Sequence, residues 1–351
     1  MFEIEEYDYK LPEDLIAQVP VPERDKSRLM VVDRSSGSLT DRHFVDLPEL
    51  LLPGDLLVVN DTKVVPARLF GRKESGGRIE ILVLEHDTEE AQRSEARWCL
   101  LRSSKRPKRG SHLFFENGFS GVVENVAQDG LIQITFHGPR SIDSLLDETG
   151  MMPLPPYIRR REKDPLSGLD RERYQTVFAE KKGAVAAPTA SLHFTEGLLA
   201  RLEQAGISVV HVTLHVGHGT FRPVRTRDIR DHRLGYEEYD LSPETAQAIG
   251  HSKSEGRRVV AVGTTVVRAL ESVAGPKGEI KSGRGKTDLL ITPGFSFRVV
   301  DALITNLHLP RSSLLFLVSA FAGPDLIREA YQEAIGKAYR FYSYGDAMLI
   351  L

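Results

Sequence analysis

The sequence predicts an α/β protein: a larger α/β barrel-like domain that is interrupted by a small antiparallel β-barrel domain. From about residue 183 onward, apolar runs of strand length alternate with helical patterns, which is typical of βα units in a mostly parallel layer or barrel. Between residues 59 and 150 the pattern changes to about six short β-rich runs separated by turn signals, which is typical of a small antiparallel barrel. We therefore expect a discontinuous α/β domain, residues 1–58 and 151–351, with the barrel domain inserted as residues 59–150.

The individual elements follow from apolar periodicity and from the residues that begin and end helices. Thr195 can cap a helix whose leucines recur at helical spacing, and Gly206 ends that helix. Further helices are expected from Gly263 and at 46–52, 243–254, 313–322 and 324–338. Strands of the α/β part are expected at 29–32, 56–60, 207–216, 259–262, 289–292, 302–305 and 341–346. Barrel strands are expected at 64–70, 78–84, 98–101, 112–115, 121–126 and 131–136.

The composition is that of an ordinary globular chain. Of its 351 residues, 41% are hydrophobic and 27% are charged, and the formal net charge is -3, so any nucleic-acid contact must come from local patches. The single cysteine, Cys99, excludes an intrachain disulfide and a cysteine-based metal site, and it fits a reducing cytosol. The start is acidic and no apolar run approaches the roughly 18 residues of a membrane span. We therefore expect a cytoplasmic protein that does not enter a membrane.

Residues with useful chemistry crowd into one stretch, residues 183–223, around which the chain is organised. They are Thr189, His193, Glu196, His215, His218 and Thr220. The strand at 207–216 has one wholly apolar face, and its other face bears His211 and His215, because side chains alternate along a strand. Gly217 and Gly219 follow at its carboxyl end, where α/β proteins bind their ligands. The alternative is a tight turn after a buried strand whose histidines are satisfied in the core.

Motifs for a bound cofactor or metal are weak. The chain has no Gly-x-x-x-x-Gly-Lys-Ser/Thr loop, and Gly217-His218-Gly219 lacks the third glycine of a dinucleotide site. On a strand, His211 and His215 would lie about 13 Å apart, which is too far to ligate one metal ion. We expect no metal.

Proton transfer and anion binding are the chemistry that these residues allow. The candidates for proton transfer are His193, His215, His218, Glu196 and Asp61. Gly263-Thr264-Thr265 at a helix start offers backbone donors and hydroxyls to an anionic group such as a carboxylate. Arg268, one turn further on, can pair with that anion or with Glu271 as a surface bridge.

Two segments are strongly basic. Lys105, Arg106, Lys108 and Arg109 form a turn within the barrel region, and a Pro-rich connection carries Tyr157 followed by Arg159, Arg160 and Arg161. A single run of charge is most often a solvated loop, and the alternative is contact with nucleic acid.

Beyond these features, the sequence resembles the S-adenosylmethionine:tRNA ribosyltransferase-isomerase family of queuosine biosynthesis over nearly its whole length. The segments that carry the resemblance are Leu15–Gln18, Asn60–Arg68, Met152–Ile158, Arg173–Val177, Ala187–Thr195, Thr213–Gly217, Gly263–Thr265, Val300–Asn306 and Phe341–Asp346. Three positions depart from the family pattern. His218 stands where a small residue is expected, Gly235 replaces a second histidine, and Leu307 stands where phenylalanine is usual.

The resemblance implies that the ribosyl unit of S-adenosylmethionine is transferred to 7-aminomethyl-7-deazaguanine at the wobble position of a tRNA. The product would be epoxyqueuosine, with adenine and methionine released. It also implies a cytoplasmic monomer that uses S-adenosylmethionine as co-substrate and acts on tRNAs with a GUN anticodon (Asp, Asn, His and Tyr tRNAs).

On this basis roles can be assigned as hypotheses. The catalytic candidates are His193 or His215 as the base for C5′, with Asp61 or Glu196 orienting it or handling the amine. Residues expected to bind S-adenosylmethionine are Thr189, Gly217, Gly219, Thr264, Thr265 and Arg268. Residues expected to contact tRNA are Arg68, Lys105, Arg106, Lys108, Arg109, Tyr157, Arg159 and Arg160.

Two other classes of function stay open at this point. One is a metal-dependent hydrolase that uses His211, His215 and His218. The other is a non-catalytic RNA-binding protein that has drifted from the family, as the change at Gly235 would allow.

Overall fold

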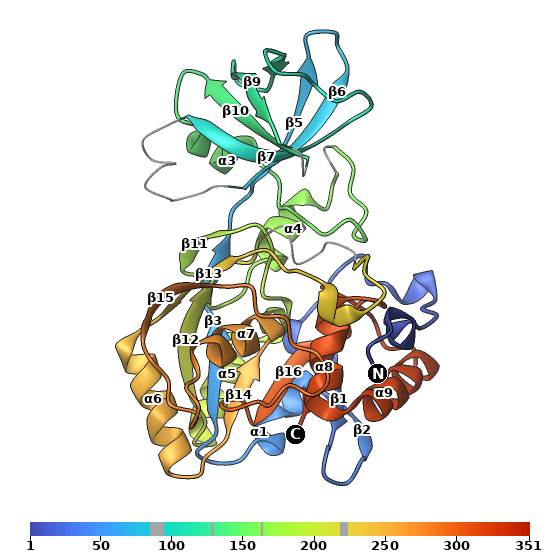
Figure 1. The fold of residues 1–351 in the computed structure, drawn as a ribbon, viewed down its shortest axis with the longest axis vertical. Coiled ribbons are helices and arrows are strands. Elements are labelled where there is room, and N and C mark those ends of the chain that lie inside the picture. The colour runs from blue at the N-terminus through green and yellow to red at the C-terminus, as the bar shows by residue number, and fades with distance from the viewer. Residues whose placement is uncertain (85–94, 128–129, 163, 218–223) are drawn as a thin grey trace. The chain divides into compact units, whose positions relative to one another are not determined.

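The computed structural model describes residues 1–84, 95–127, 130–162, 164–217 and 224–351 (Figure 1). The chain divides into two compact units. The α/β unit comprises residues 1–62, 176–179 and 188–351, and the barrel unit comprises residues 63–175 and 180–187. Residues 151–175, which we expected in the α/β domain, therefore group with the barrel. No helix among the described residues is long and apolar enough to cross a membrane.

A nine-stranded mixed sheet forms the centre of the α/β unit, in the order β15-β13-β12-β3-β14-β16-β17-β1-β2. Its strands are β1 (Arg28–Val32), β2 (Leu39–His43), β3 (Leu56–Asn60), β12 (Ser208–Leu214), β13 (Glu237–Leu241), β14 (Val259–Val262), β15 (Gly283–Thr287), β16 (Ala302–Asn306) and β17 (Ala347–Ile350). The four central strands β12, β3, β14 and β16 run parallel to one another, whereas β12 pairs antiparallel with β13 and β16 pairs antiparallel with β17. The predicted α/β class is thus confirmed, and the large sheet is open rather than closed into a barrel.

Three helices of this unit begin at a side-chain cap, which is provided by Thr195, Ser242 and Ser312. The helices of the unit are α1 (Leu47–Leu50), α5 (Glu196–Gln204), α6 (Pro243–Ser254), α7 (Thr264–Val273), α8 (Ser313–Ala322) and α9 (Pro324–Gly336). Short 3-10 helices are η1 (Ile4–Tyr7), η2 (Glu13–Leu15), η3 (Arg24–Lys26), η4 (Phe44–Asp46), η5 (Thr189–His193) and η7 (Ile229–Asp231). The Thr195 hydroxyl accepts a hydrogen bond from the Leu198 amide at 3.1 Å, as its sequence position predicted.

The central strands have continuous apolar sequences because both of their faces are buried in the core. Every residue of β3, β14 and β16 is buried. Leu57 and Val59 pack with Leu198 and Leu202 of α5 in one apolar cluster, whereas Val58 points to the opposite face of the sheet. Helix α7 contacts β3, β12, β14 and β16.

Two predicted strands are wrong, and each of these segments contacts a residue that is distant in the sequence. Residues 289–292 form no strand, because the Leu289 carbonyl accepts a hydrogen bond from Arg268 Nε at 3.0 Å, and β15 pairs with β13 instead. Residues 341–346 form a turn before β17, with Tyr342 at φ 71. The Asp346 carboxylate closes this turn by accepting the amides of Arg340 at 2.7 Å and Arg28 at 3.0 Å.

The barrel unit contains the six predicted strands, closed in the order β10-β7-β6-β5-β8-β9. They are β5 (Arg68–Lys73), β6 (Arg78–Val83), β7 (Ala96–Ser103), β8 (His112–Phe114), β9 (Ser120–Val126) and β10 (Leu131–His137). This unit also holds α3 (Ile142–Thr149), α4 (Ser167–Arg173) and a two-stranded ribbon of β4 (Thr62–Val64) with β11 (Lys181–Ala184). Alternate residues such as Ile79, Ile81 and Val83 fill the interior.

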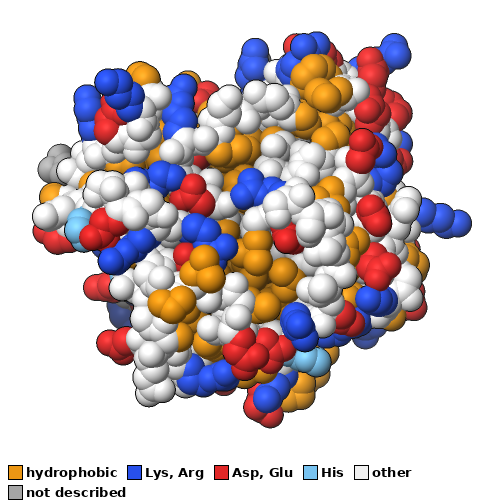
Figure 2. Space-filling model, turned by 90° about the horizontal axis from the view of Figure 1, so that it is seen from below, with side chains coloured by type: hydrophobic (Ala, Val, Ile, Leu, Met, Phe, Trp, Pro, Cys, Tyr) orange, Lys and Arg blue, Asp and Glu red, His pale blue; other side chains and the backbone are white. Residues whose placement is uncertain are grey.

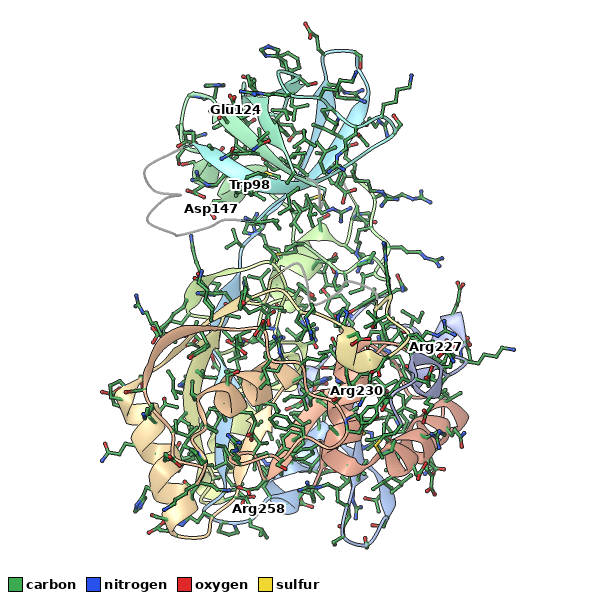
Figure 3. All side chains as sticks on the ribbon, in the orientation of Figure 1. Trp98, Glu124, Asp147, Arg227, Arg230 and Arg258 are labelled. Carbon is green, nitrogen blue, oxygen red and sulfur yellow. The ribbon has the colours of Figure 1, made fainter. Side chains whose placement is uncertain are left out.

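The amino ends of β3 and β14 are joined by an ion pair. Arg258, labelled in Figure 3, donates to the buried Asp55 carboxylate from Nε at 3.0 Å and from Nη2 at 2.5 Å. Asp55 also accepts the Leu52 amide at 2.8 Å. This edge of the sheet is therefore closed by a structural ion pair, so a ligand site belongs at the opposite, carboxyl edge.

Candidate active site

Polar side chains lie at the carboxyl ends of three of the four parallel central strands, and a glycine follows the fourth. Asn60-Asp61-Thr62 follows β3, His215 follows β12, Gly263 follows β14, and β16 ends in Asn306. After β3 the chain builds β12 on one side of it and then β14 on the other. Such a reversal of winding opens a crevice at the carboxyl edge, which is where α/β proteins bind their ligands.

The ends of β3 and β12 are fastened together by side-chain hydrogen bonds. Asn60 donates to the Leu214 carbonyl at 2.9 Å and accepts the Leu214 amide at 3.1 Å. The Thr213 hydroxyl donates to Asp61 Oδ1 at 2.7 Å. Two of the residues involved, Asp61 and Asn60, are almost completely buried. The register of the two strands thus places the Asp61 carboxylate at a fixed position beside β12.

His215 is half-buried at the end of β12, and Thr62 holds its ring. Thr62 Oγ1 and His215 Nδ1 are 2.7 Å apart. The backbone of His215 is fixed as well, because its amide donates to the Glu238 carbonyl at 2.9 Å. An imidazole that is held in a fixed orientation at a half-buried position is suited to exchange a proton with a ligand.

A second group of polar residues surrounds Glu237 on β13. The buried Glu237 carboxylate accepts the Gly217 amide at 3.2 Å through Oε1 and pairs with Arg268 Nη1 through Oε2. Arg268 Nε donates to Leu289, and its Nη2 is buried without a hydrogen-bond partner among the described residues. A buried guanidinium nitrogen that is left unpaired is costly, so this group is poised to bind an anion.

The surface bridge from Arg268 to Glu271 does not form. Glu271 is buried, and its two carboxylate oxygens accept the backbone amides of Arg298 at 2.9 Å and of Val299 and Val300 at 3.0 Å. Glu271 therefore holds the loop before β16, and Arg268 is directed to Glu237.

The start of α7 offers further donors. Thr264 and Thr265 are buried, and Thr265 Oγ1 has no hydrogen-bond partner among the described residues. Gly263 has a φ of 97°, and a Cβ there would lie 3.6 Å from Thr265 Oγ1 and 3.7 Å from Ala190 Cβ. The first amides of a helix lack intrahelical partners and carry the positive end of its dipole. This corner is therefore built to receive a small anionic group.

His193 lies in the core and is fully engaged. Its ring stacks on Phe44 with centroids 5.0 Å apart. Asn306 Nδ2 donates to the Tyr342 carbonyl at 3.1 Å and to His193 Nε2 at 3.2 Å, so Nδ1 carries the proton and donates to Ser27 Oγ at 2.7 Å. Burial lowers the pKa of His193 from 6.5 to about 3, with a further contribution from the positive charges of nearby arginines. The ring is neutral at physiological pH.

The remaining candidates of the α/β unit are less closely tied to the carboxyl edge. Glu196 is exposed in the first turn of α5, and Thr189 is half-buried at the start of η5. Gly219 and His218 lie outside the described residues. A Cβ at Gly235 would have no heavy atom within 4 Å, so the histidine expected there would have room.

In the barrel unit the predicted RNA-binding residues fall into two groups. Lys105, Arg106, Lys108, Arg109 and Arg159 are exposed, and Tyr157 is half-buried. Arg68 instead pairs with Glu80 at 2.6 Å. Arg160 is buried and donates to both oxygens of Asp170, at 2.6 Å and 3.0 Å.

Several polar residues of the carboxyl edge were missing from the sequence-based candidates. They are Thr62, Thr213, Glu237 and Asn306. Strand alternation is the signal that could have found Thr213, because it places Thr213 on the same face as His215. For Glu237 the signal was the family resemblance, since residues 232–237 keep the glutamate of the family pattern, although its partners Gly217 and Arg268 are distant in the sequence.

The fold and the carboxyl-edge site are those of an α/β enzyme that carries a β-barrel unit. Among the described residues, no three His, Cys, Asp or Glu side chains form a group that could hold a metal ion.

Comparison with known proteins identifies the family. The family described as queuosine biosynthesis protein matches residues 4–350. The S-adenosylmethionine:tRNA ribosyltransferase-isomerases of Halothermothrix orenii and Trichlorobacter lovleyi are each 50% identical to the chain over 351 residues, with 99% of both partners covered. A crystal structure of S-adenosylmethionine tRNA ribosyltransferase from Thermotoga maritima is 40% identical, covers 99% of this chain and 100% of its own, and gives a TM-score of 0.56. The chain belongs to the queuosine biosynthesis protein family and is a transferase. The resemblance seen in the sequence is confirmed, and the metal-dependent hydrolase is not favoured.

Proposed function

We propose that the protein transfers the ribosyl moiety of S-adenosylmethionine to 7-aminomethyl-7-deazaguanine at the wobble position of a tRNA and isomerises it. The products are epoxyqueuosine in the tRNA, adenine and methionine. The observation that carries this proposal is the 50% identity over the whole chain to relatives named for this reaction. The carboxyl-edge site supports it, because that site supplies a base and an anion-binding corner.

His215 is assigned as the base that removes a C5′ proton from the sulfonium substrate. The positive sulfur acidifies these protons, which makes their removal by a protein base easier. His215 is half-buried at the end of β12 and is oriented by Thr62, whereas His193 is buried in the core between Ser27 and Asn306. His193 is thus assigned a supporting role, in which it fixes Asn306 at the end of β16.

Asp61 is assigned to the substrate amine. Its carboxylate is buried beside β12 and is fixed by Thr213, so it can receive a cationic amine at a defined position. Glu196 is exposed on α5, which makes it the weaker candidate for this role.

The methionine carboxylate is assigned to the corner at the start of α7. Arg268 Nη2 and Thr265 Oγ1 are buried there and have no hydrogen-bond partner in the part of the chain that the structure describes, and Thr264 is the first residue of the helix. Gly217 is held against this corner by Glu237. Thr189 and Gly219 are retained as further residues for S-adenosylmethionine from the sequence pattern.

The exposed basic residues of the barrel unit are assigned to tRNA phosphates. They are Lys105, Arg106, Lys108, Arg109 and Arg159, with Tyr157 as a stacking surface. We also propose that the tRNAs carry a GUN anticodon and that the protein acts as a monomer in the cytoplasm.

The test is an incubation with S-adenosylmethionine and a tRNA that carries 7-aminomethyl-7-deazaguanine, followed by nucleoside mass spectrometry and an adenine assay. The wild-type protein should form epoxyqueuosine and release one adenine per nucleoside. His215→Ala should lower kcat by about 10²- to 10⁴-fold, which is the usual worth of a general base. His211→Ala is the matched control, because His211 is exposed on the same strand and should keep wild-type activity. Full activity of His215→Ala would show that His215 is not the base. If the wild-type protein bound tRNA but formed no product, it would instead be a non-catalytic RNA-binding protein.

A further inference from the structure

The outer face of the barrel has a groove across β5, β6 and β7 that no role described so far explains. Side chains alternate between the interior and the exterior of these strands. Arg72 lies directly opposite Arg78, and Glu80 lies directly opposite Arg102, in the pairing of the strands. With Arg161 from the connection, these residues line an open cavity of about 1020 Å³.

The arginine groove, as we call the cavity lined by Arg72, Arg78, Arg102 and Arg161, has an excess of positive charge. Its two carboxylates are Glu80, which is already paired with Arg68, and Glu162. The four arginines are exposed, and in the described part of the chain none of them forms an ion pair. By contrast, Lys and Arg side chains are mixed with Asp and Glu across the face of the molecule drawn in Figure 2.

The opposed arginines point to an anionic ligand. Like charges directly opposite each other on antiparallel strands destabilise the pair. Arg72 and Arg78 are such a pair, and within the described ranges the Arg72 guanidinium makes one long hydrogen bond, of 3.4 Å from Nη1 to the Gly76 carbonyl. Bound phosphate groups would remove this repulsion and would be held by several guanidinium groups at once.

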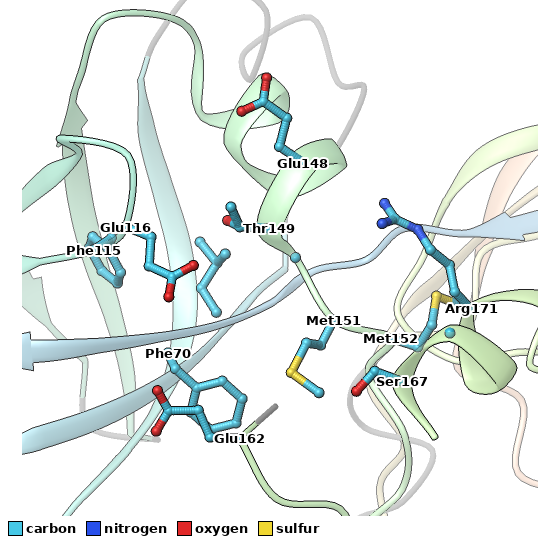
Figure 4. A pocket seen from close by; sticks show the side chains of 13 residues that line it. Phe70, Phe115, Glu116, Glu148, Thr149, Met151, Met152, Glu162, Ser167 and Arg171 are labelled. Atoms are coloured by element: carbon cyan, nitrogen blue, oxygen red, sulfur yellow. The ribbon is translucent and has the colours of Figure 1, made fainter. Parts of the chain in front are cut away.

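A smaller pocket adjoins the arginine groove and shares two lining residues with it, Phe70 and Glu162. Its volume is about 300 Å³, at the lower end of the usual range for small-molecule sites. Phe70, Phe115 and Met151 give it apolar walls, and the Glu116 carboxylate reaches toward it (Figure 4). We call it the Phe70 pocket. Flat apolar walls with a few acceptor groups suit a nucleobase, which stacks through its face and donates through its edge.

We propose that this outer face of the barrel unit binds single-stranded RNA, with phosphates in the arginine groove and one unstacked base in the Phe70 pocket. The proposal rests on the proposed function, whose tRNA substrate supplies unpaired nucleotides in its anticodon loop. A regular duplex would fill the groove but could not place a base in the pocket, because its bases are stacked.

The groove continues directly into the basic turn already assigned to phosphates. Ser103 and Ser104 line the groove after Arg102, and the turn begins with Lys105. The Lys105 carbonyl accepts hydrogen bonds from Lys73 Nζ and from the Ser103 hydroxyl, both at 2.8 Å. The turn is therefore tied to the strands that form the groove, and the two make one basic track.

The first experiment measures binding of a labelled anticodon stem-loop RNA and of a loop-free RNA duplex of equal length between 50 and 200 mM salt. Arg78→Glu/Arg102→Glu removes two phosphate contacts, so the slope of log K against log salt should fall by about 1.4. Over this fourfold range of salt, the wild type should lose about sevenfold more affinity for the stem-loop than the variant does. Arg284→Glu/Lys286→Glu is the matched control, since it changes the same charge at two exposed positions of β15 and should bind like the wild type. Equal salt slopes in the groove variant and the wild type would show that the arginine groove does not bind RNA phosphates.

The Phe70 pocket is tested with the same two RNAs. Phe70→Leu keeps an apolar side chain and removes the stacking surface, so stem-loop binding should weaken roughly 5- to 150-fold while duplex binding stays the same. Urea unfolding of this variant shows whether the barrel remains folded. If Phe70→Leu lost the same affinity for both RNAs, or lost affinity for neither, the Phe70 pocket would not bind a base.

Turnover separates this inference from the proposed function. With saturating S-adenosylmethionine, the groove variant should show a raised KM for tRNA and an unchanged kcat for adenine release. If the wild type releases no adenine but the groove variant still binds the stem-loop more weakly than the wild type, the proposed reaction is wrong and the RNA-binding role of the groove is supported. If the wild type releases adenine and the groove variant has an unchanged KM for tRNA, the proposed reaction is supported and the RNA-binding role of the groove is wrong.

Discussion

Lowering the pH from 7 to 5 will destabilise the α/β unit, because two buried histidines stay neutral in the folded chain but bind a proton in the unfolded chain. His193 is held between Ser27 and Asn306, and His308 Nε2 lies 2.8 Å from the Thr305 hydroxyl. Burial lowers the pKa of each ring from 6.5 to about 3. Between these two pKa values only the unfolded chain binds a proton at these positions, so the free energy of unfolding falls as the pH falls.

The size of the effect follows from the two pKa values. With an unfolded pKa of 6.5 and a folded pKa near 3, each histidine removes about 1.9 kcal/mol between pH 7 and pH 5. Both together remove about 4 kcal/mol, and a folded pKa one unit higher would change this little, because the folded ring would still be mostly neutral at pH 5. Most carboxylates titrate below this window, which leaves the histidines as its main source of pH dependence.

The assay is urea unfolding of the full chain at pH 7 and pH 5. The variants are His193→Gln, His308→Gln and the double variant, and the quantity compared is the loss of unfolding free energy between the two pH values. Each single variant should show a loss about 1.9 kcal/mol smaller than that of the wild type, whatever its stability at pH 7. A double variant with the same pH dependence as the wild type would refute the reasoning.

Two further predictions concern buried ion pairs. Arg160→Met should destabilise the barrel unit by about 1.5–3 kcal/mol, because it removes two charged hydrogen bonds from the buried Asp170 carboxylate, whereas Arg160→Met/Asp170→Leu should recover part of that loss in urea unfolding. Arg159→Glu at the exposed neighbour should change stability by less than about 0.5 kcal/mol, and a similar loss in both single variants would contradict the role of the pair. Arg268→Met/Glu237→Gln removes the Arg268 guanidinium without stranding a carboxylate, and it should raise the KM for S-adenosylmethionine by roughly 10- to 150-fold, the value of one charged hydrogen bond. An unchanged KM, measured by adenine release at saturating tRNA, would show that Arg268 serves only the fold.

Local physics made the helices and buried strands predictable. Thr195 caps α5 as expected, and β14 occupies the predicted residues 259–262, because an apolar run of four residues between polar ends can only be a buried strand here. The six barrel strands were predictable for the same reason, since turn residues separate short runs of alternating character.

Long-range contacts defeated the prediction elsewhere. Residues 289–292 have a strand-like composition, but the Leu289 carbonyl is taken by Arg268, which is 21 residues earlier in the chain. Residues 341–346 likewise form a turn because the Asp346 carboxylate captures two backbone amides, one of them from Arg28. Secondary-structure propensity depends on residues that are close in the sequence, so it does not include partners from distant parts of the chain.

The sequence by itself determined the α/β class, the presence of a barrel, and which residue types the chemistry has to use. Only the tertiary structure decided what each of those residues is free to do. His193 and His215 look equivalent in the sequence, yet one is stacked on Phe44 in the core and the other lies half-buried at a strand end. Arg159 and Arg160 are adjacent, yet one is exposed and the other is buried against Asp170. The physical reason is that pKa and availability depend on burial and on partners from distant parts of the chain, which the fold brings together.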